Sequence, residues 1–220
     1  TIKLIGTEFA RFGVESTVVP QTDLSAWQAA IKSNTKILFA ETPTNPLTEV
    51  CDIAALADMA HKAGAWLAVD NCFATPALQR PALLGADIIM HSGTKYLDGQ
   101  GRVMAGALCA STAMVNEKFL PVMKNSGMIL SPFNAWVVLK GLETLGLRMD
   151  RHCENALKLA QALEKIEGVK SVKYPFLPSH PQWPGTPLQP HPRRPAVGIG
   201  MGGASAHRRP RRSETGARLA

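Results

Sequence analysis

Short apolar segments and amphipathic segments alternate regularly between residues 22 and 87, and this alternation constrains the fold more than any other feature of the sequence. Apolar runs at 36–41, 66–70 and 87–91 are predicted strands, and helix-like segments separate them. Consecutive parallel strands need such crossovers, because the chain must return to the same edge of the sheet before each new strand. The sequence therefore predicts an α/β fold with a mostly parallel sheet sandwiched by helices.

Residues that favour helix ends mark the crossovers. Thr22 or Asp23 is expected to cap a helix that runs to about Ser33, and Asp52 a helix that stops before Gly64. The remaining expected elements are a short crossover at 77–84, strands at 13–19, 105–110 and 169–174, and a long helical region from 132 to 168. The strand at 169–174 would begin a second, smaller domain.

The formal net charge of +7 belongs almost entirely to one end of the chain. Residues 181–220 hold seven arginines and a single acid, Glu214, and so carry +6. They contain no lysine, and seven prolines interrupt any periodic pattern. Two interpretations fit: a disordered basic arm, or translation in the wrong frame after a break near Gln182. Because the charge is not spread over a folded surface, no nucleic-acid partner is expected.

The cysteines and the apolar runs indicate in which cellular compartment the protein is expected. Cys51, Cys72, Cys109 and Cys153 are irregularly spaced, which favours reduced thiols over a metal site or a disulfide framework. No run approaches the roughly 18 apolar residues of a membrane span, and the first twenty residues lack the order of a signal peptide. We therefore expect a cytoplasmic protein without a membrane partner. Since a predicted strand follows Thr1 closely and no methionine precedes it, we expect a fragment.

Polar side chains follow three predicted strands, at the edge where parallel sheets bind ligands. Asp70 ends the second strand, and Lys95 lies in a turn after the third. An aldehyde cofactor needs a lysine amine that is unprotonated near neutral pH, and a pyridine nitrogen needs a carboxylate that stabilises its protonated form. Lys95 and Asp70 together therefore indicate a site for pyridoxal 5'-phosphate (PLP).

Three neighbouring residues have two interpretations each. Ser92 and Thr94 can donate hydroxyls to a phosphate beside Lys95, or they can satisfy the local backbone of a turn. Gly93 between them permits a close approach of the backbone. Asn45 can contact a ligand, or it can be a turn residue before a proline.

Four motifs occur in the order in which a known family carries them. They are Glu41-Thr42-Pro43-Thr44-Asn45-Pro46, Val69-Asp70-Asn71 with Thr75-Pro76, His91-Ser92-Gly93-Thr94-Lys95-Tyr96, and Gly127-Met128-Ile129-Leu130-Ser131-Pro132-Phe133. Over about residues 1–180 the chain resembles the Cys/Met-metabolism group of PLP-dependent enzymes, and most of all its O-succinylhomoserine sulfhydrylases. This resemblance implies an aspartate-aminotransferase-like (fold type I) large domain, truncated at the N-terminus and in the C-terminal small domain.

The resemblance also implies roles for the residues of the site. Lys95 would bind the cofactor aldehyde and move protons, and Asp70 would hold the pyridinium. Ser92 and Thr94 would bind the phosphate, and Asn45 the phenolic oxygen of the cofactor or the substrate carboxylate. Cys72 is either a nucleophile or a small packing residue beneath the ring.

The implied reaction is a γ-replacement in which O-succinylhomoserine and sulfide give homocysteine. The alternatives are a cystathionine γ-synthase, a methionine γ-lyase, or a catalytically inactive truncated remnant. Residues 1–145 would form part of the PLP-binding domain, and 146–180 the connecting helix and the start of the small domain. Family members form homotetramers as dimers of dimers. The family's upstream phosphate-binding amides, its ring-stacking tyrosine and its carboxylate-binding arginine have no counterpart here, so we expect weak or no activity.

Overall fold

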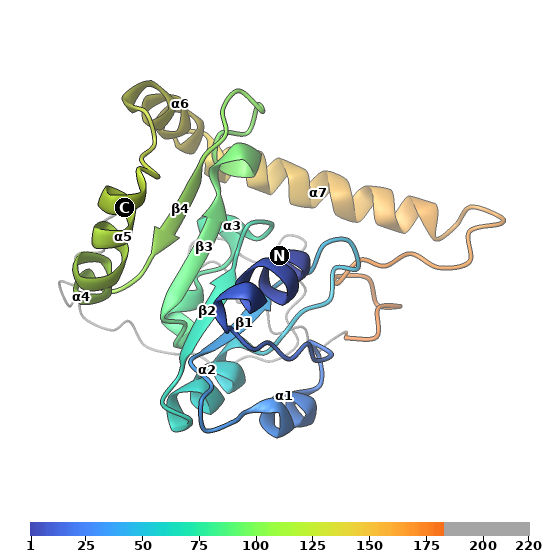
Figure 1. Cartoon of the computed structure of the whole chain (residues 1–220). Helices are drawn as coiled ribbons and strands as arrows, with labels where there is room; N and C mark the ends of the chain where they lie inside the picture. The colour runs from blue at the N-terminus through green and yellow to red at the C-terminus, as the bar shows by residue number, and fades with distance from the viewer. Residues whose placement is uncertain (183–220) are drawn as a thin grey trace, which may run out of the picture.

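The computed structural model describes residues 1–182, which are built around a four-stranded sheet (Figure 1). The strands, in spatial order, are β1 Ile37–Glu41, β2 Trp66–Asp70, β3 Ile88–Ser92 and β4 Gly106–Cys109. β1, β2 and β3 are parallel, and β4 pairs antiparallel with β3. The prediction of a mostly parallel sheet is confirmed, and the apolar run at 105–110 supplies its antiparallel edge.

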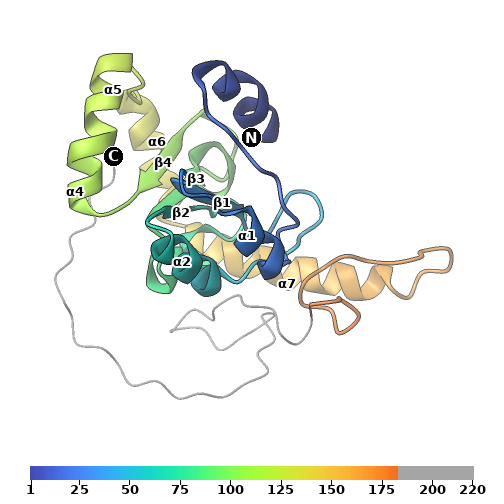
Figure 2. The ribbon, with the colours of Figure 1, turned by 60° about the horizontal axis from the view of Figure 1, so that its bottom comes forward.

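Helices connect the strands and extend beyond the sheet. The α-helices are α1 Leu24–Ala30, α2 Ile53–Lys62, α3 Thr75–Leu78, α4 Thr112–Met114, α5 Leu120–Ser126, α6 Pro132–Leu142 and α7 Leu145–Leu163. Shorter π- or 3-10 segments are η1 Leu4–Glu8, η2 Phe9–Phe12, η3 Pro81–Leu84, η4 Gly93–Leu97 and η5 Val115–Phe119. Figure 2 shows α1 and α2 together on one side of the sheet and α4 to α6 beside β4.

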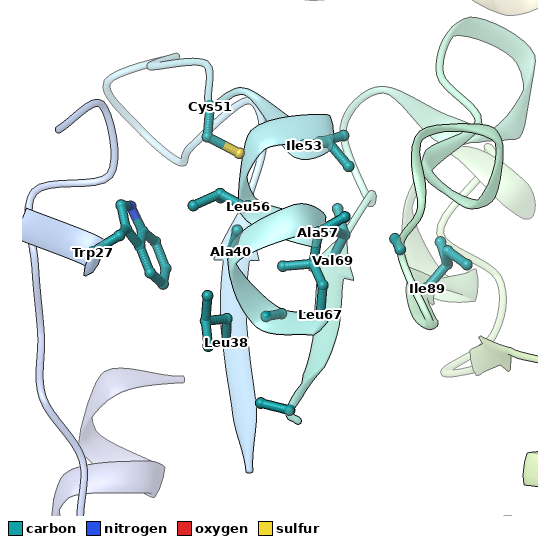
Figure 3. Close-up of a cluster of buried hydrophobic side chains, with 13 residues drawn as sticks. Trp27, Leu38, Ala40, Cys51, Ile53, Leu56, Ala57, Leu67, Val69 and Ile89 are labelled. Carbon is teal, nitrogen blue, oxygen red and sulfur yellow. The ribbon is translucent and has the colours of Figure 1, made fainter. Parts of the chain in front are cut away.

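The main core lies between α2 and one face of the sheet (Figure 3). Strand residues of alternate positions, Leu38 on β1 and Leu67 and Val69 on β2, point toward the apolar stripe of α2. Leu56 of that stripe has no exposed surface, and Trp27 of α1 closes the open side. The period-2 pattern of the strands and the helical pattern of α2 thus bury the same cluster.

Aspartates begin both helices of this layer, as their positions predicted. The Asp23 carboxylate accepts hydrogen bonds from the Ser25 and Ala26 amides at 2.9 and 3.1 Å, and Asp52 accepts one from Ala55 at 3.0 Å. α1 ends at Ala30, short of the predicted end. After α2 the chain turns through a left-handed conformation at Gly64, with φ of +67°, which ends the helix.

The long helical region predicted from residue 132 is two helices. α6 ends at Leu142, and Thr144 has non-helical backbone angles before α7 begins. α7 contacts η4, α3 and α6, so its first turns lie at the carboxyl edge of the parallel strands. Its far end extends away from the sheet, as both views show.

Two predicted strands are absent from the structure. Residues 13–19 and 169–174 form no strand. A strand is stable only beside a partner, and none of residues 1–182 pairs with either segment. In addition, the helical stretch from Thr112 to Ser126 was not predicted.

No helix within residues 1–182 is long and apolar enough to cross a membrane. All four cysteines are free thiols. The two interpretations of residues 181–220 concern a segment that lies almost wholly outside the described residues.

Candidate active site

The structure brings the ends of three strands together at one edge of the sheet. Glu41 at the end of β1 pairs in register with Asp70 at the end of β2, and Asp70 pairs with Met90, two residues before Ser92. The turn that carries Lys95 follows at once as η4. This is the carboxyl edge at which open parallel sheets bind ligands.

A cysteine joins the aspartate to the neighbouring strand end. The Cys72 amide donates to the Asp70 carboxylate at 3.0 Å, and the Ser92 amide donates to the Cys72 sulfur at 2.8 Å. Burial, together with the hydrogen bond and charge of Asp70, raises the pKa of the Cys72 thiol to about 12. The thiol is therefore protonated at neutral pH, which favours the packing interpretation of Cys72 over the nucleophilic one.

Lys95 projects from a turn that departs from helical geometry at this residue, with φ of −89° and ψ of −117°. Its Nζ lies 5.4 Å from the centre of the Phe73 ring, which is a cation–π distance. The Lys95 side chain is exposed within residues 1–182, so these residues do not bury its amine.

Glu41 lies close enough to Asp70 and Lys95 for their charges to shift its pKa. Burial and the nearby charge of Asp70 raise the pKa of Glu41, while Lys95 and the Asn45 amide act in the opposite direction. Two carboxyl groups and one amine therefore share this edge. Sequence reasoning placed Glu41 in a motif but gave it no role.

The two hydroxyl residues are held differently. Thr94 is engaged with Ala105: its hydroxyl donates to the Ala105 carbonyl at 3.3 Å and accepts from the Ala105 amide at 3.1 Å. The Ser92 hydroxyl has no such backbone partner among the described residues. Thr94 thus satisfies local backbone, as one of its two interpretations stated, and Ser92 is the more available phosphate donor.

At Gly93 the backbone closely approaches another part of the chain, at Ala105. A Cβ on Gly93 would lie 2.7 Å from the Cβ of Ala105, at the start of the segment that leads into β4. The glycine therefore lets the turn pack against residue 105. An alanine at this position would require the turn or residue 105 to shift.

Asn45 lies in the loop after β1 and lines a cavity of about 350 Å³. The other walls come from the loop after β1, from Phe73 and Tyr96, from α7, and from residues 174–176. Lys95, Asp70, Ser92 and Thr94 are not among the lining residues. Tyr96, the residue after Lys95, thus borders the cavity, and Lys95 itself does not line it.

Buried polar residues behind the edge were missed by the sequence analysis. Gln79 donates to the Thr42 carbonyl at 3.2 Å and to the Asn71 side chain at 2.9 Å, which ties the ends of β1 and β2 together. His91 is also buried, and burial lowers its pKa. Its Nδ1 has no hydrogen-bond partner among the residues described. Nothing in the local sequence pattern distinguished Gln79 from an ordinary crossover residue.

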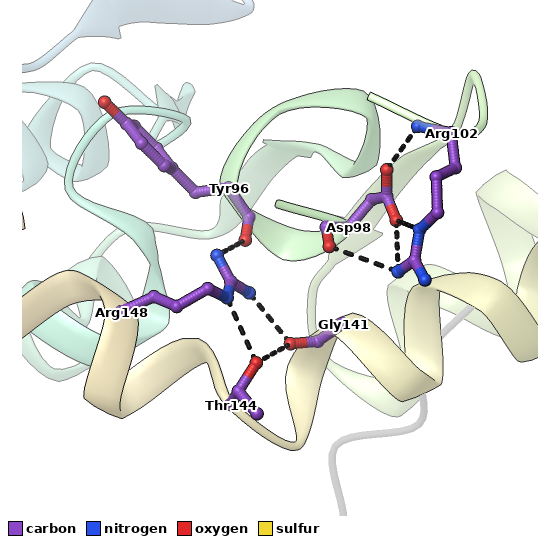
Figure 4. Close-up of polar contacts among 6 residues, drawn as sticks. All are labelled: Tyr96, Asp98, Arg102, Gly141, Thr144 and Arg148. Carbon is purple, nitrogen blue, oxygen red and sulfur yellow. Dashed lines mark hydrogen bonds and ion pairs between the residues drawn. The ribbon is translucent and has the colours of Figure 1, made fainter. Parts of the chain in front are cut away.

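Two arginines anchor the turn that follows Lys95 (Figure 4). Arg102 donates to the buried Asp98 carboxylate through both its amide, at 2.7 Å, and its Nε, at 2.8 Å. Burial raises the pKa of Asp98, but these hydrogen bonds and the charge of Arg102 outweigh it, and the pKa lies below its ordinary value. Arg148 of α7 donates to the Tyr96 carbonyl at 2.8 Å.

The comparisons with known proteins agree on one family. The family model for Cys/Met metabolism PLP-dependent enzymes matches residues 1–187. An O-succinylhomoserine sulfhydrylase of Pseudomonas aeruginosa is 54% identical over 182 residues, which cover 83% of this chain and 45% of that protein. A cystathionine gamma-synthase of Mycobacterium tuberculosis is 45% identical over 181 residues, with 82% and 47% covered.

A solved structure shows the same relation in three dimensions. The crystal structure of metB from Corynebacterium glutamicum superposes with a TM-score of 0.80 at 43% identity. The match covers 82% of this chain and 47% of that one. The chain therefore spans about half the length of the relatives that it matches.

Proposed function

The chain belongs to the Cys/Met-metabolism family of PLP-dependent enzymes, and we propose that the edge formed by Asp70, Ser92 and Lys95 is one part of a PLP site. The observation that carries this proposal is the hydrogen-bonded chain from Asp70 through Cys72 to Ser92, beside the turn of Lys95. These hydrogen bonds hold the Asp70 carboxylate and Ser92, on neighbouring strands, close to the turn that carries the Lys95 amine.

The chemistry of these groups fits the cofactor. PLP presents an aldehyde, a ring nitrogen and a phosphate, and the edge offers an amine, a carboxylate and a hydroxyl. The Ser92 hydroxyl is not taken up by the local backbone, so it can donate to a phosphate oxygen. Phe73, whose ring lies under the Lys95 ammonium, adds an apolar wall.

Each residue then has a stated task. When bound, the cofactor supplies an electron sink for charge that develops on the substrate carbon. Lys95 would bind the aldehyde group of the cofactor and carry protons at its Nζ. Asp70 would stabilise a protonated ring nitrogen, and the Cys72 amide holds the Asp70 carboxylate in place. Ser92 would orient the phosphate, Thr94 would support the turn through its hydrogen bonds to Ala105, and Asn45 would contact the phenolic oxygen or the substrate carboxylate.

The reaction that we propose for the whole protein is γ-replacement of O-succinylhomoserine by sulfide, which forms homocysteine. The 54% identity to an O-succinylhomoserine sulfhydrylase supports it, against 45% to a cystathionine gamma-synthase. Cystathionine γ-synthesis and methionine γ-elimination are the alternatives within the family. A homotetramer in the cytoplasm, without nucleic-acid or membrane partners, accompanies this proposal.

Covalent trapping tests the site. The 220-residue chain is incubated with PLP, reduced with borohydride and digested, and mass spectrometry locates the modified lysine. We expect modification at Lys95, loss of it in Lys95→Ala, and strong weakening in Asp70→Ala. Lys62→Ala serves as the control, because Lys62 is an exposed partner of Asp58 on α2. Modification spread evenly over surface lysines would rule the site out.

Product analysis tests the reaction and separates it from an inactive remnant. Because the chain spans about half the length of its relatives, we expect little or no homocysteine from O-succinylhomoserine and sulfide. Lys95→Ala must abolish any product that forms. A remnant without function would also fail the trapping experiment, whereas a partial site passes it.

A further inference from the structure

α7 contacts the lysine turn, which we define as residues 93–99, through the His152 ring, whose centre lies 5.4 Å from that of the Tyr96 ring, and through hydrogen bonds of Arg148. The Arg148 guanidinium donates to the Tyr96 carbonyl at 2.8 Å and to the Gly141 carbonyl at 2.8 Å, and its Nε donates to the Thr144 hydroxyl at 3.1 Å (Figure 4). We propose that Arg148 is a positioning residue that fixes the direction of Lys95. This inference rests on the proposed PLP site.

Arg148 contacts the backbone directly beside Lys95. Tyr96 directly follows Lys95, so the peptide that Arg148 holds also determines where the Lys95 Cα–Cβ bond points. The backbone leaves helical geometry at Lys95, which means that the regular helical ladder does not fix this residue. The turn closes on itself through the Asp98 amide, which donates to the Gly93 carbonyl at 3.0 Å, and the Gly99 amide, which donates to the Lys95 carbonyl at 2.7 Å. An anchor from outside therefore restricts the remaining freedom.

The surroundings are shaped for a guanidinium. A Cβ on Gly99, which has φ of +76°, would overlap the Arg148 guanidinium. A Cβ on Gly141 would overlap the backbone of Leu97 and Asp98, so this glycine lets α6 approach the turn. The planar fork of arginine reaches the three acceptors at once, which the point charge of a lysine cannot do.

Arg148 also joins the junction between α6 and α7 to the lysine turn, which lies 52 residues earlier in the sequence. It belongs to α7, while its acceptors lie on the lysine turn, at the end of α6 and in the break between the two helices. The Asp98–Arg102 pair restrains the far side of the turn and does not reach α7. A displacement of α7 is therefore transmitted to Lys95 through Arg148.

Arg148→Ala and Arg148→Lys test the inference, with Arg151→Ala as the matched control. Arg151 lies one turn further along α7, is exposed, and pairs with Glu154 at 3.6 Å. The first readout is hydrogen exchange of the chain without cofactor. In Arg148→Ala we expect the Asp98 and Gly99 amides to exchange about tenfold faster, since a hydrogen bond to a charged group is worth about that factor. Amides of α2 should keep their rates.

The second readout is covalent trapping of PLP. We expect the concentration of PLP that half-saturates Lys95 to rise about tenfold in Arg148→Ala, with a larger share of the label on other lysines. Arg148→Lys should restore part of the selectivity, and Arg151→Ala should match the wild type. A loss of folding would also lower the selectivity for Lys95, so the labelling is compared only in variants whose α2 amides keep their wild-type exchange rates. If Arg148→Ala fails to fold, Arg148→Lys carries the test.

The outcomes separate the two proposals. Failure of the wild-type chain to label at Lys95 would refute the PLP site, and the exchange rates would still decide what Arg148 does to the turn. Normal labelling of Lys95 in the wild type and an unchanged half-saturation in a folded Arg148 variant would refute the positioning role alone. Wild-type exchange rates at residues 98 and 99 in Arg148→Ala would refute it as well.

Discussion

The two sides of the lysine turn differ in how completely their apolar residues are covered. On one side, α2 and the strands bury a shared cluster, in which Leu56 has no exposed surface. On the other, α6 packs on the turn but leaves Phe133, Trp136 and Leu139 exposed by 68%, 55% and 56%. The layer of α2 is thus stabilised within residues 1–182, and the outer face of α6 gains little from them.

The difference is clearest for one pair of leucines. Leu56→Ala should lower the free energy of unfolding by about 2–5 kcal/mol, because it opens a cavity in the covered layer. Leu139→Ala, the matched control on α6, should cost less than about 0.5 kcal/mol. Urea unfolding followed by circular dichroism measures both. Equal losses would mean that α6 is as well covered as α2, which would break the comparison.

The contact between α6 and the lysine turn gives the next largest effect. An alanine in an exposed helix normally stabilises it relative to glycine by about 0.5–1 kcal/mol. At Gly141 we expect the reverse, a loss of about 1–3 kcal/mol, because a Cβ would collide with the backbone of Leu97 and Asp98. Lys140→Ala, at the neighbouring exposed position, is the control. A stabilised Gly141→Ala would show that α6 does not press on the turn.

The cap of α2 is expected to contribute less to stability than its buried core. Asp52→Ala removes the acceptor for the Ala55 amide at the start of α2 and should cost about 1 kcal/mol. Asp58→Ala removes only an exposed ion pair with Lys62 and should cost less than about 0.5 kcal/mol. Thermal melts of the two variants compare them directly. An Asp52→Ala melt as high as that of Asp58→Ala would mean that α2 does not depend on its cap.

The same division explains what the sequence could predict. The β1, β2 and β3 strands, their parallel pairing and the caps of α1 and α2 follow from local patterns and short-range hydrogen bonds, and all were predicted. The fold type I large domain is confirmed by the likeness to solved PLP enzymes. The strand expected at 169–174 was wrong, because an apolar pattern does not show whether a pairing strand is present.

The site was predictable to the extent that its groups end strands. Asp70, Ser92 and Lys95 could be placed at one edge because parallel strands share their carboxyl end. The hydrogen bond of Thr94 to residue 105 and the exposure of Lys95 depend on packing, which the motif does not encode. Arg148 was missed because its acceptor lies 52 residues away and is a backbone carbonyl, a group with no sequence signature.

A pH titration gives the smallest expected effect and concerns the strand ends. Since the pKa of Glu41 is raised in the folded chain, the folded state holds the proton more tightly than the unfolded state. Its contribution to stability is present below the ordinary pKa of glutamate and is lost as pH rises through the folded value. Above about pH 4.5, the urea midpoint of unfolding should therefore fall less steeply with pH in Glu41→Gln than in the wild type. The exposed control, Glu8→Gln, should show the same pH dependence as the wild type. If the midpoint of Glu41→Gln fell with pH as steeply as that of the wild type, the raised pKa of Glu41 would be contradicted.

A crystal structure of the chain with PLP tests the central claim most directly. The account predicts continuous density from the Lys95 Nζ to the cofactor, a ring nitrogen within hydrogen-bond distance of the Asp70 carboxylate, and a phosphate at the Ser92 hydroxyl. A cofactor bound elsewhere, or bound here with its ring nitrogen away from Asp70, would contradict it.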